Sequence, residues 1–349
     1  MADSTNNNPA APIVLNLALQ GGGSHGAFTW GVLDTLLEDG RFVFEGISGT
    51  SAGAMNATVL AAGFAKAASL DLTDQAQVHA KGCELARLAL RNFWEAVGTM
   101  GAFLNVSPSR LAAQWMPWLK PLMLPSHLSP AQSNPMDINP LRDLLRRQID
   151  FELIKQYQGQ GVVPRLFIGA TNVRTGRSKV FQEEGISLDA LMASACLPQV
   201  FKAVEIDGEH YWDGGFSGNP AIYPLIYKTE SDDVLLVQIN PIETESVPQT
   251  MPEIQERINE VTFNASLLSE LRAIEFVRRL LQEGRLDSQF YKDIHMHRID
   301  GGAFLHTFGS ESKMRADIGF LQQLFEKGRE SALQWLQLHA ADVGVRSSM

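Results

Sequence analysis

The segment at 49–53, with the sequence Gly-Thr-Ser-Ala-Gly, most constrains how this chain can fold. It stands between a short apolar stretch at 42–48, which predicts a buried strand, and a helix-forming stretch at 54–62. A serine on such a sharp strand-to-helix turn holds its hydroxyl exposed above the helix N-terminus. The flanking glycines fit because a Cβ would collide where the strand and the helix pack closest. A five-residue pattern alone also fits a plain turn, but the strand and helix around it favour Ser51 as a nucleophile.

A second glycine-rich turn lies upstream, between a predicted strand at 13–19 and a predicted helix at 27–39. Strand, glycine loop, helix and strand in this order predict an α/β fold with parallel strands. The loop has two interpretations, because free backbone N–H groups at a helix N-terminus bind any negative oxygen. They could bind the pyrophosphate of a dinucleotide, or they could form an oxyanion hole.

The dinucleotide interpretation uses Gly21, Gly23 and Gly26 as G-x-G-x-x-G and Glu45 as a ribose ligand. It leaves an exposed serine at the end of the next strand without a role. An acyl-transfer site needs that serine beside the N–H donors, and adjacent parallel strands would place both at one sheet edge. The sequence therefore favours an oxyanion hole, and a titration with NAD would test the alternative.

Composition limits the partners. The chain has 349 residues, is 45% hydrophobic and carries a net charge of −10, which argues against nucleic acid or an anionic bilayer as an electrostatic partner. Its two cysteines, Cys83 and Cys196, indicate neither a disulfide framework nor a zinc site. No apolar run is long enough to span a membrane, and residues 1–12 are polar and predict a disordered tail without a signal peptide. We expect a cytoplasmic protein.

Residues 64–140 predict a helical insertion, with repeated prolines and four prominent aromatic residues: Trp94, Phe103, Trp115 and Trp118. One interpretation is a subdomain with its own apolar core. The other is a lid whose residues 93–123 contact a lipid surface or line an acyl channel. The two interpretations are compatible.

The rest of the chain continues the α/β pattern and ends in a part rich in helices, at 250–349. A hairpin is predicted at 204–212 around an Asp-Gly turn, and Thr250 with Glu253 forms a capping box. Further strands are predicted at 165–171, 179–181, 234–239 and 294–299, and helices at 188–195 and 316–339.

A serine nucleophile needs a base. A Ser-Asp-His order is possible with His295, His297 or His306, but that hydrolase fold places its serine several strands further along the sheet. His295 and His297 form an H-x-H without a nearby carboxylate cluster, and we interpret them as the polar face of an edge strand rather than a metal site. Asp213, which follows the hairpin, is the better candidate. An aspartate is a weak base, so burial would have to raise its pKa.

Three motifs in this order resemble those of the patatin-like phospholipases, which are Ser-Asp lipid acyl hydrolases. The glycine loop at 21–26 resembles the family's oxyanion loop, 49–53 its nucleophile elbow, and Asp213-Gly214-Gly215 its D-G-A/G. The segments around 171–176 and 193–201 also match, so the likeness covers roughly residues 13–230. One departure is His25, where the family usually has a basic Arg or Lys that braces the loop.

The resemblance implies a three-layer patatin-like domain over 13–349, with a mainly parallel sheet between helical layers and an insertion. It implies Ser51 as nucleophile, Asp213 as base and no metal or cofactor. The oxyanion donors would be Gly21, Gly22 and Gly23, and the other glycines of the three motifs are Gly26, Gly49, Gly53, Gly214 and Gly215. The expected function is hydrolysis of lipid carboxylic esters through an acyl-enzyme. The alternatives are an intracellular storage-polyester depolymerase and a non-catalytic lipid- or granule-surface protein.

Overall fold

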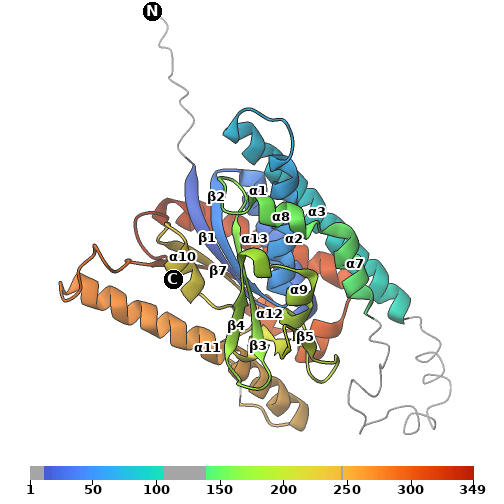
Figure 1. Cartoon of the computed structure of the whole chain (residues 1–349). Helices are drawn as coiled ribbons and strands as arrows, with labels where there is room; N and C mark the ends of the chain where they lie inside the picture. The colour runs from blue at the N-terminus through green and yellow to red at the C-terminus, as the bar shows by residue number, and fades with distance from the viewer. Residues whose placement is uncertain (1–11, 106–138, 245–246) are drawn as a thin grey trace, which may run out of the picture.

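A computed structural model describes residues 12–105, 139–244 and 247–349 of the chain (Figure 1). Its centre is an eight-stranded sheet in the order β5-β6-β3-β2-β1-β7-β8, with β4 paired to β3 beside this path. The strands are β1 (Ile13–Leu19), β2 (Phe42–Thr50), β3 (Arg165–Asn172), β4 (Ser178–Phe181), β5 (Val204–Ile206), β6 (Glu209–Asp213), β7 (Asp233–Gln238) and β8 (His295–Asp300).

Five neighbouring strands, from β3 to β8, are parallel, and the antiparallel pairs gather at the β5–β6 end of the sheet. The parallel strands therefore end at one common edge. In the register, Leu19 of β1 lies beside Gly49 of β2, and Thr50 lies beside Gly169 of β3. The two glycine-rich turns of the sequence thus leave the sheet next to each other.

Helices cover both faces of the sheet. They are α1 (Gly26–Asp39), α2 (Ala52–Ala68), α3 (Gln75–Asn105), α7 (Pro140–Gln148), α8 (Phe151–Tyr157), α9 (Leu188–Ser194), α10 (Tyr223–Lys228), α11 (Met251–Gln282), α12 (Gly302–His306) and α13 (Ile318–His339). Figure 1 shows the long helix α11 on the side of the sheet opposite α2 and α3. Short 3-10 turns are η1 (Gly23–His25), η3 (Glu183–Gly185), η4 (Gly214–Phe216), η5 (Ser310–Met314) and η6 (Ala340–Asp342).

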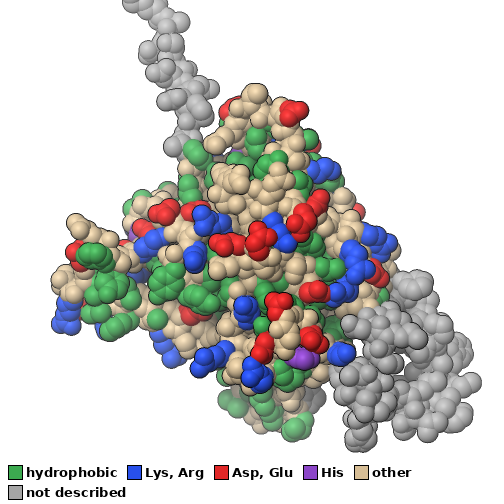
Figure 2. All heavy atoms as spheres, in the orientation of Figure 1, with side chains coloured by type: hydrophobic (Ala, Val, Ile, Leu, Met, Phe, Trp, Pro, Cys, Tyr) green, Lys and Arg blue, Asp and Glu red, His purple; other side chains and the backbone are tan. Residues whose placement is uncertain are grey.

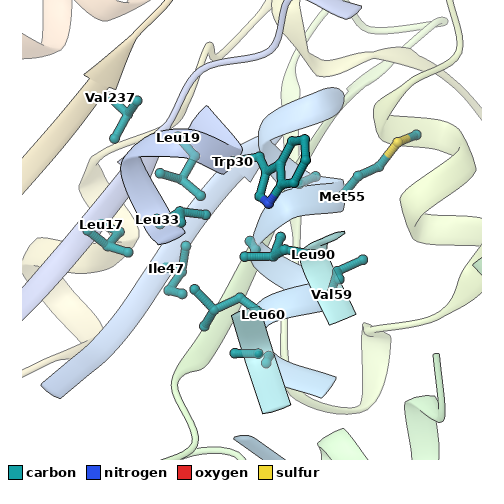
Figure 3. Close-up of a cluster of buried hydrophobic side chains, with 14 of the residues drawn as sticks. Leu17, Leu19, Trp30, Leu33, Ile47, Met55, Val59, Leu60, Leu90 and Val237 are labelled. Atoms are coloured by element: carbon teal, nitrogen blue, oxygen red, sulfur yellow. The ribbon is translucent and has the colours of Figure 1, made fainter. Parts of the chain in front are cut away.

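Alternation along the strands divides the core into two clusters. Leu17 and Leu19 point into the cluster shared with α1, α2 and α3, whereas Ala18 between them points into the cluster shared with α10 and α11. Figure 3 shows the first cluster, where the side chains of β1, β2 and β7 meet those of the helices. The expected fold of a mainly parallel sheet between helical layers is confirmed.

Local signals placed several elements correctly. Asp207 and Gly208 have φ angles of 52° and 77°, as a tight hairpin turn between β5 and β6 requires, and the Thr250–Glu253 capping box is formed. One boundary differs, because α2 continues through Gly63 instead of ending there. A Cβ at Gly63 would lie 2.4 Å from the backbone of Ala86, so this glycine serves the close crossing of α2 and α3.

The first half of α11 exposes an apolar stripe. The side chains of Ile254, Ile258 and Val261, which follow one another at helical spacing, are 37%, 52% and 53% exposed. Leu267 and Ile274, in the second half, are buried against the sheet. Figure 2 shows hydrophobic side chains exposed at the base of the molecule, where α11 begins in Figure 1. The stripe is unburied because the helix extends past the sheet.

Two predicted segments fall wholly or largely outside the described residues: the N-terminal tail and the insertion beyond Asn105, which contains Trp115 and Trp118. None of the helices in the described ranges is long and apolar enough to cross a bilayer.

Candidate active site

The turn at Ser51 has the strained geometry expected of a nucleophile elbow. Ser51 has φ 54° and ψ −122°, which L-residues rarely adopt, and it stands directly before α2. A Cβ at Gly49 would lie 2.7 Å from the backbone of Gly53, and a Cβ at Gly53 would lie 2.2 Å from the carbonyl oxygen of Leu19. Only glycines let the strand and helix approach this closely, as the sequence predicted.

Asp213 ends β6 at the same edge of the sheet. Asp213 pairs with Ala170 of β3, and the preceding residue of β3, Gly169, pairs with Thr50 of β2. Asp213 and Ser51 therefore lie at the same height along β3, on its two sides. The chain then crosses toward β2, because a Cβ at Gly214 would lie 2.4 Å from the Gly169 oxygen and 3.0 Å from Thr50 Cγ2. This crossing brings Asp213 close to the elbow, where the Ser51 side chain is one of the groups that lower the pKa of the buried Asp213 carboxyl.

The carboxylate of Asp213 is buried, with 2% of the residue exposed, and its Oδ1 accepts a hydrogen bond of 2.7 Å from Gly215 N–H. Burial raises the pKa of Asp213 to about 6, against the lowering effects of the Gly215 N–H and the Ser51 hydroxyl. Asp213 is therefore ionised at neutral pH, and it is a stronger base than an ordinary aspartate.

No histidine is among the hydrogen-bond partners of Ser51 or Asp213 in the described parts of the chain. His297 and His295 instead lie 2.9 Å and 3.4 Å from Asp233, at the amino-terminal edge of the sheet. β8, which carries both histidines, is an edge strand as expected, but His297 does not lie on a solvent-facing polar face, because it is fully buried against Trp335 of α13.

The glycine loop offers two free donors rather than three. The N–H of Gly21 donates to Asn219 Oδ1 at 2.7 Å, so it is occupied, and the prediction of Gly21 as an oxyanion donor is corrected. The hydrogen bonds of the described residues leave the N–H groups of Gly22 and Gly23 without an acceptor. Gly21 instead serves close approach, because a Cβ there would lie 2.8 Å from Ser51 Cβ.

Ser194 is a site residue that the sequence left without a role. It is fully buried at the end of α9, and its hydroxyl accepts a hydrogen bond of 2.9 Å from Ser51 N–H. This bond holds the strained backbone of the elbow. The available signal was its place in the segment at 193–198, one of those that resemble the family.

His25 is anchored without a charge. Burial, followed by the charge of Lys313, lowers its pKa to about 3, so the ring is neutral at physiological pH. Its Nε2 lies 2.7 Å from Ser312 Oγ, and the rings of Phe308 and Phe320 are each 6.1 Å away, centroid to centroid. The C-terminal part of the chain thus packs against the glycine loop.

Trp94 corrects part of the lid prediction. It is 3% exposed, and its indole N–H donates to Asn56 Oδ1 at 2.9 Å, while Asn56 Nδ2 donates to the Gly26 oxygen at 2.9 Å. Phe93 beside it is also buried. The first two aromatic residues of the predicted contact region at 93–123, Phe93 and Trp94, are therefore part of the core. Trp94 supports the start of α1 through Asn56.

Glu45, the ribose ligand of the dinucleotide alternative, is engaged elsewhere. Its carboxylate accepts hydrogen bonds from the backbone N–H groups of Glu230 and Ser231, at 2.7 and 2.9 Å. Within the described ranges, no three His, Cys, Asp or Glu side chains are grouped so that they could hold a metal ion.

Among solved structures, the chain is similar to VipD from Legionella pneumophila, with 16% identity and a TM-score of 0.40 over 94% of this chain and 67% of VipD. It is also similar to the structure of the heterodimeric ExoU–SpcU complex from the type III secretion system of Pseudomonas aeruginosa. There the identity is 17% and the TM-score 0.34, over 94% of this chain and 52% of the other. The chain thus spans about half to two thirds of the length of these proteins.

No curated protein sequence matches the chain significantly. A family model described as patatin-like phospholipase matches residues 17–226, which is more than half of the chain and includes the elbow, the glycine loop and Asp213. The chain belongs to the patatin-like phospholipase family.

Proposed function

We propose that the protein hydrolyses carboxylic esters of lipids, with Ser51 as nucleophile and Asp213 as its base. Family membership supports a lipid acyl hydrolase at the level of the family. The observation that carries the proposal is the pairing of a half-buried serine in a strained turn with a buried aspartate whose pKa is raised to about 6.

In the first half of the reaction, the Ser51 oxygen attacks the ester carbonyl as its proton passes to the Asp213 carboxylate. The carbonyl oxygen becomes negative, and the N–H groups of Gly22 and Gly23 donate to it. Collapse of this intermediate expels the alcohol, which takes the proton from Asp213, and leaves the acyl group on Ser51.

In the second half, Asp213 takes a proton from water while the water oxygen attacks the acyl-enzyme. The oxyanion forms again at the same donors, and its collapse releases the fatty acid as Ser51 regains a proton from Asp213. The N-terminus of α2 beneath Ser51 and that of α1 beyond the glycine loop both favour negative charge at this edge of the sheet.

The test combines turnover with covalent labelling. We expect the purified protein to hydrolyse p-nitrophenyl esters and to react with a fluorophosphonate at Ser51, located by mass spectrometry of the labelled peptide. Ser51→Ala should abolish both, while Ser69→Ala, in the exposed end of α2, should change neither. A screen over acyl chain lengths, head groups and a storage polyester then identifies the substrate. Failure to hydrolyse any ester or to be labelled would favour the non-catalytic lipid-surface protein.

A further inference from the structure

Four buried carboxamides surround the first residue of the glycine loop. They are Gln20, Asn219, Asn240 and Asn264, none of them more than 2% exposed, and they come from the end of β1, the loop after η4, the end of β7 and the middle of α11. Gln20 Oε1 accepts from the backbone N–H groups of residues 239 and 240, and Gln20 Nε2 donates to Asn264 Oδ1 at 3.1 Å. Buried amides linked in this way specify one arrangement of the backbone they contact.

Asn240 fixes the peptide that leads into the free donors. Its Nδ2 donates to the carbonyl oxygen of Gly21 at 2.7 Å. In a trans peptide, the C=O and the next N–H point in opposite directions. With the Gly21 oxygen turned to Asn240, the N–H of Gly22 must therefore point away from Asn240, and it cannot rotate without breaking this bond.

Lys313 fixes Asn240 in turn. Its Nζ donates to Asn240 Oδ1 at 2.9 Å. An ammonium can only donate, so the amide must present its oxygen to Lys313 and its nitrogen to Gly21. Without the ammonium, only the two acceptors of Nδ2, the Gly21 oxygen and Gln20 Oε1, would hold the amide in this orientation, and the Asn240 contact with the loop would be weaker.

The turn η5, which carries Lys313, contacts the loop at two further points. Gly23 has a φ of 58°, and a Cβ there would lie 2.2 Å from the carbonyl oxygen of Lys313. The hydroxyl of Ser312 meets the ring of His25. Thus the backbone of η5 covers the loop while its lysine reaches the amide network.

We propose that Asn240 and Lys313 are positioning residues of the oxyanion hole, through which the C-terminal part of the chain orients the N–H groups of Gly22 and Gly23. Both lie outside residues 17–226, the part that matches the family model. The inference rests on the proposed function, since it assigns these residues to the same site. Neither residue reaches the reacting atoms; Lys313 acts through Asn240, and Asn240 acts through the peptide that follows Gly21.

The experiment compares Asn240→Leu, Lys313→Met and Lys313→Arg with Lys327→Met, which removes a lysine of α13 that pairs with Glu330. Oxyanion donors stabilise the transition state more than the bound ester, so misorienting them lowers kcat and leaves KM unchanged. We expect kcat on a soluble ester to fall about 10- to 100-fold for Asn240→Leu. Lys313→Met should show a smaller fall, Lys313→Arg should recover most of it, and Lys327→Met should match the wild type.

Two further measurements make the assignment specific. The double variant Asn240→Leu/Lys313→Met should be no slower than Asn240→Leu alone, because the lysine acts only through the amide. Hydrogen exchange of the peptide spanning 17–28 should be faster in Asn240→Leu and Lys313→Met than in Lys327→Met, and this readout requires no turnover.

Folded Asn240→Leu and Lys313→Met variants with wild-type kcat, a loss confined to KM, or unchanged exchange at 17–28 would each overturn the inference. If Asn240→Leu fails to fold, the test rests on Lys313→Met and Lys313→Arg, because the Lys313 side chain is partly exposed and its replacement should disturb the fold less. A wild-type protein without esterase activity would instead overturn the proposed function, and the exchange experiment would still decide whether Asn240 and Lys313 hold the loop.

Discussion

The two edges of the sheet carry similar residues in different settings. At the carboxyl edge, Ser51 and Asp213 lie near each other on either side of β3. At the amino-terminal edge, Ser348 Oγ lies 2.8 Å from His297 Nδ1, and His297 Nε2 lies 2.9 Å from Asp233 Oδ1, so serine, histidine and aspartate stand in a row. By residue type alone, the second row looks more like a hydrolase site than the first.

The surroundings reverse that impression. Ser51 has a strained backbone beside free N–H groups, whereas the N–H of Ser348 donates to the Met296 oxygen at 3.1 Å, which ties the C-terminal tail along β8. Burial would raise the pKa of Asp233, but its hydrogen bonds from His297 and from Gly344 N–H outweigh burial and lower that pKa. Asp233 is thus a stable anion that fastens the tail, whereas burial raises the pKa of Asp213, the base that we propose.

We infer from this comparison that backbone donors, and the direction in which the carboxylate pKa is shifted, distinguish a reactive group of side chains from a structural one. The three side chains at the amino-terminal edge fasten the C-terminal tail to β7 and β8. The pair at the carboxyl edge lies beside the free N–H groups of Gly22 and Gly23, which could donate to a developing oxyanion.

The largest effect that we predict separates the two aspartates by turnover. Asp213→Asn should lower kcat by at least about 10²–10⁴-fold, because an amide cannot accept the serine proton. The same assay on Asp233→Asn should give a kcat close to that of the wild type. In the wild type, log kcat/KM should fall with a slope of one below about pH 6, as Asp213 becomes protonated. A folded Asp233→Asn variant as inactive as Asp213→Asn would show that the tail row takes part in the chemistry.

The second prediction is that the same two substitutions change stability with opposite signs. The pKa of Asp213 is raised from 3.8 to about 6 in the folded protein, so folding favours its protonated form and stability falls as the pH rises through this window. At pH 8 the cost is at most about 3 kcal/mol, and Asp213→Asn should recover much of it. Near pH 4 the gain should vanish.

Asp233 has a lowered pKa in the folded state, so it contributes stability above its unfolded pKa, and this is lost as the pH falls through the folded value. Asp233→Asn should therefore reduce the free energy of unfolding at pH 8, by about 1–3 kcal/mol, because hydrogen bonds to a charged acceptor are lost. Urea unfolding of both variants at pH 4.5 and pH 8 measures the signs. Equal signs at pH 8 would contradict the contrast between base and anchor.

The sequence could predict what local chemistry decides. The strand-to-helix turn at Ser51, the Asp-Gly hairpin before Asp213 and the capping box of α11 each lie within a few residues, and all three formed as expected. Parallel strands joined by a helix then required the glycine loop and Ser51 to share an edge.

Contacts between segments that are distant in the sequence could not be predicted from the sequence alone. The N–H of Gly21 is occupied by Asn219, 198 residues away, and Lys313 acts on a loop almost 300 residues earlier in the chain. The sequence left both a core position and a lipid-facing position open for Trp94, because an aromatic residue at helical spacing fits either until its neighbours are known. The packing of α3 against α2 and the start of α1 decides between them.

The smallest effect that we predict concerns the serine of the tail row. Ser348→Ala removes one hydrogen bond to His297, so the free energy of unfolding should change by about 1 kcal/mol or less, and kcat should stay within about twofold of the wild type. Ser348 is not among the described residues with a positive φ, and its own N–H donates to Met296, so a fluorophosphonate should not label it even in the Ser51→Ala protein. Label on the C-terminal peptide of that protein, or a loss of kcat in Ser348→Ala comparable to that in Ser51→Ala, would show that side-chain constellation outweighs backbone setting in this fold.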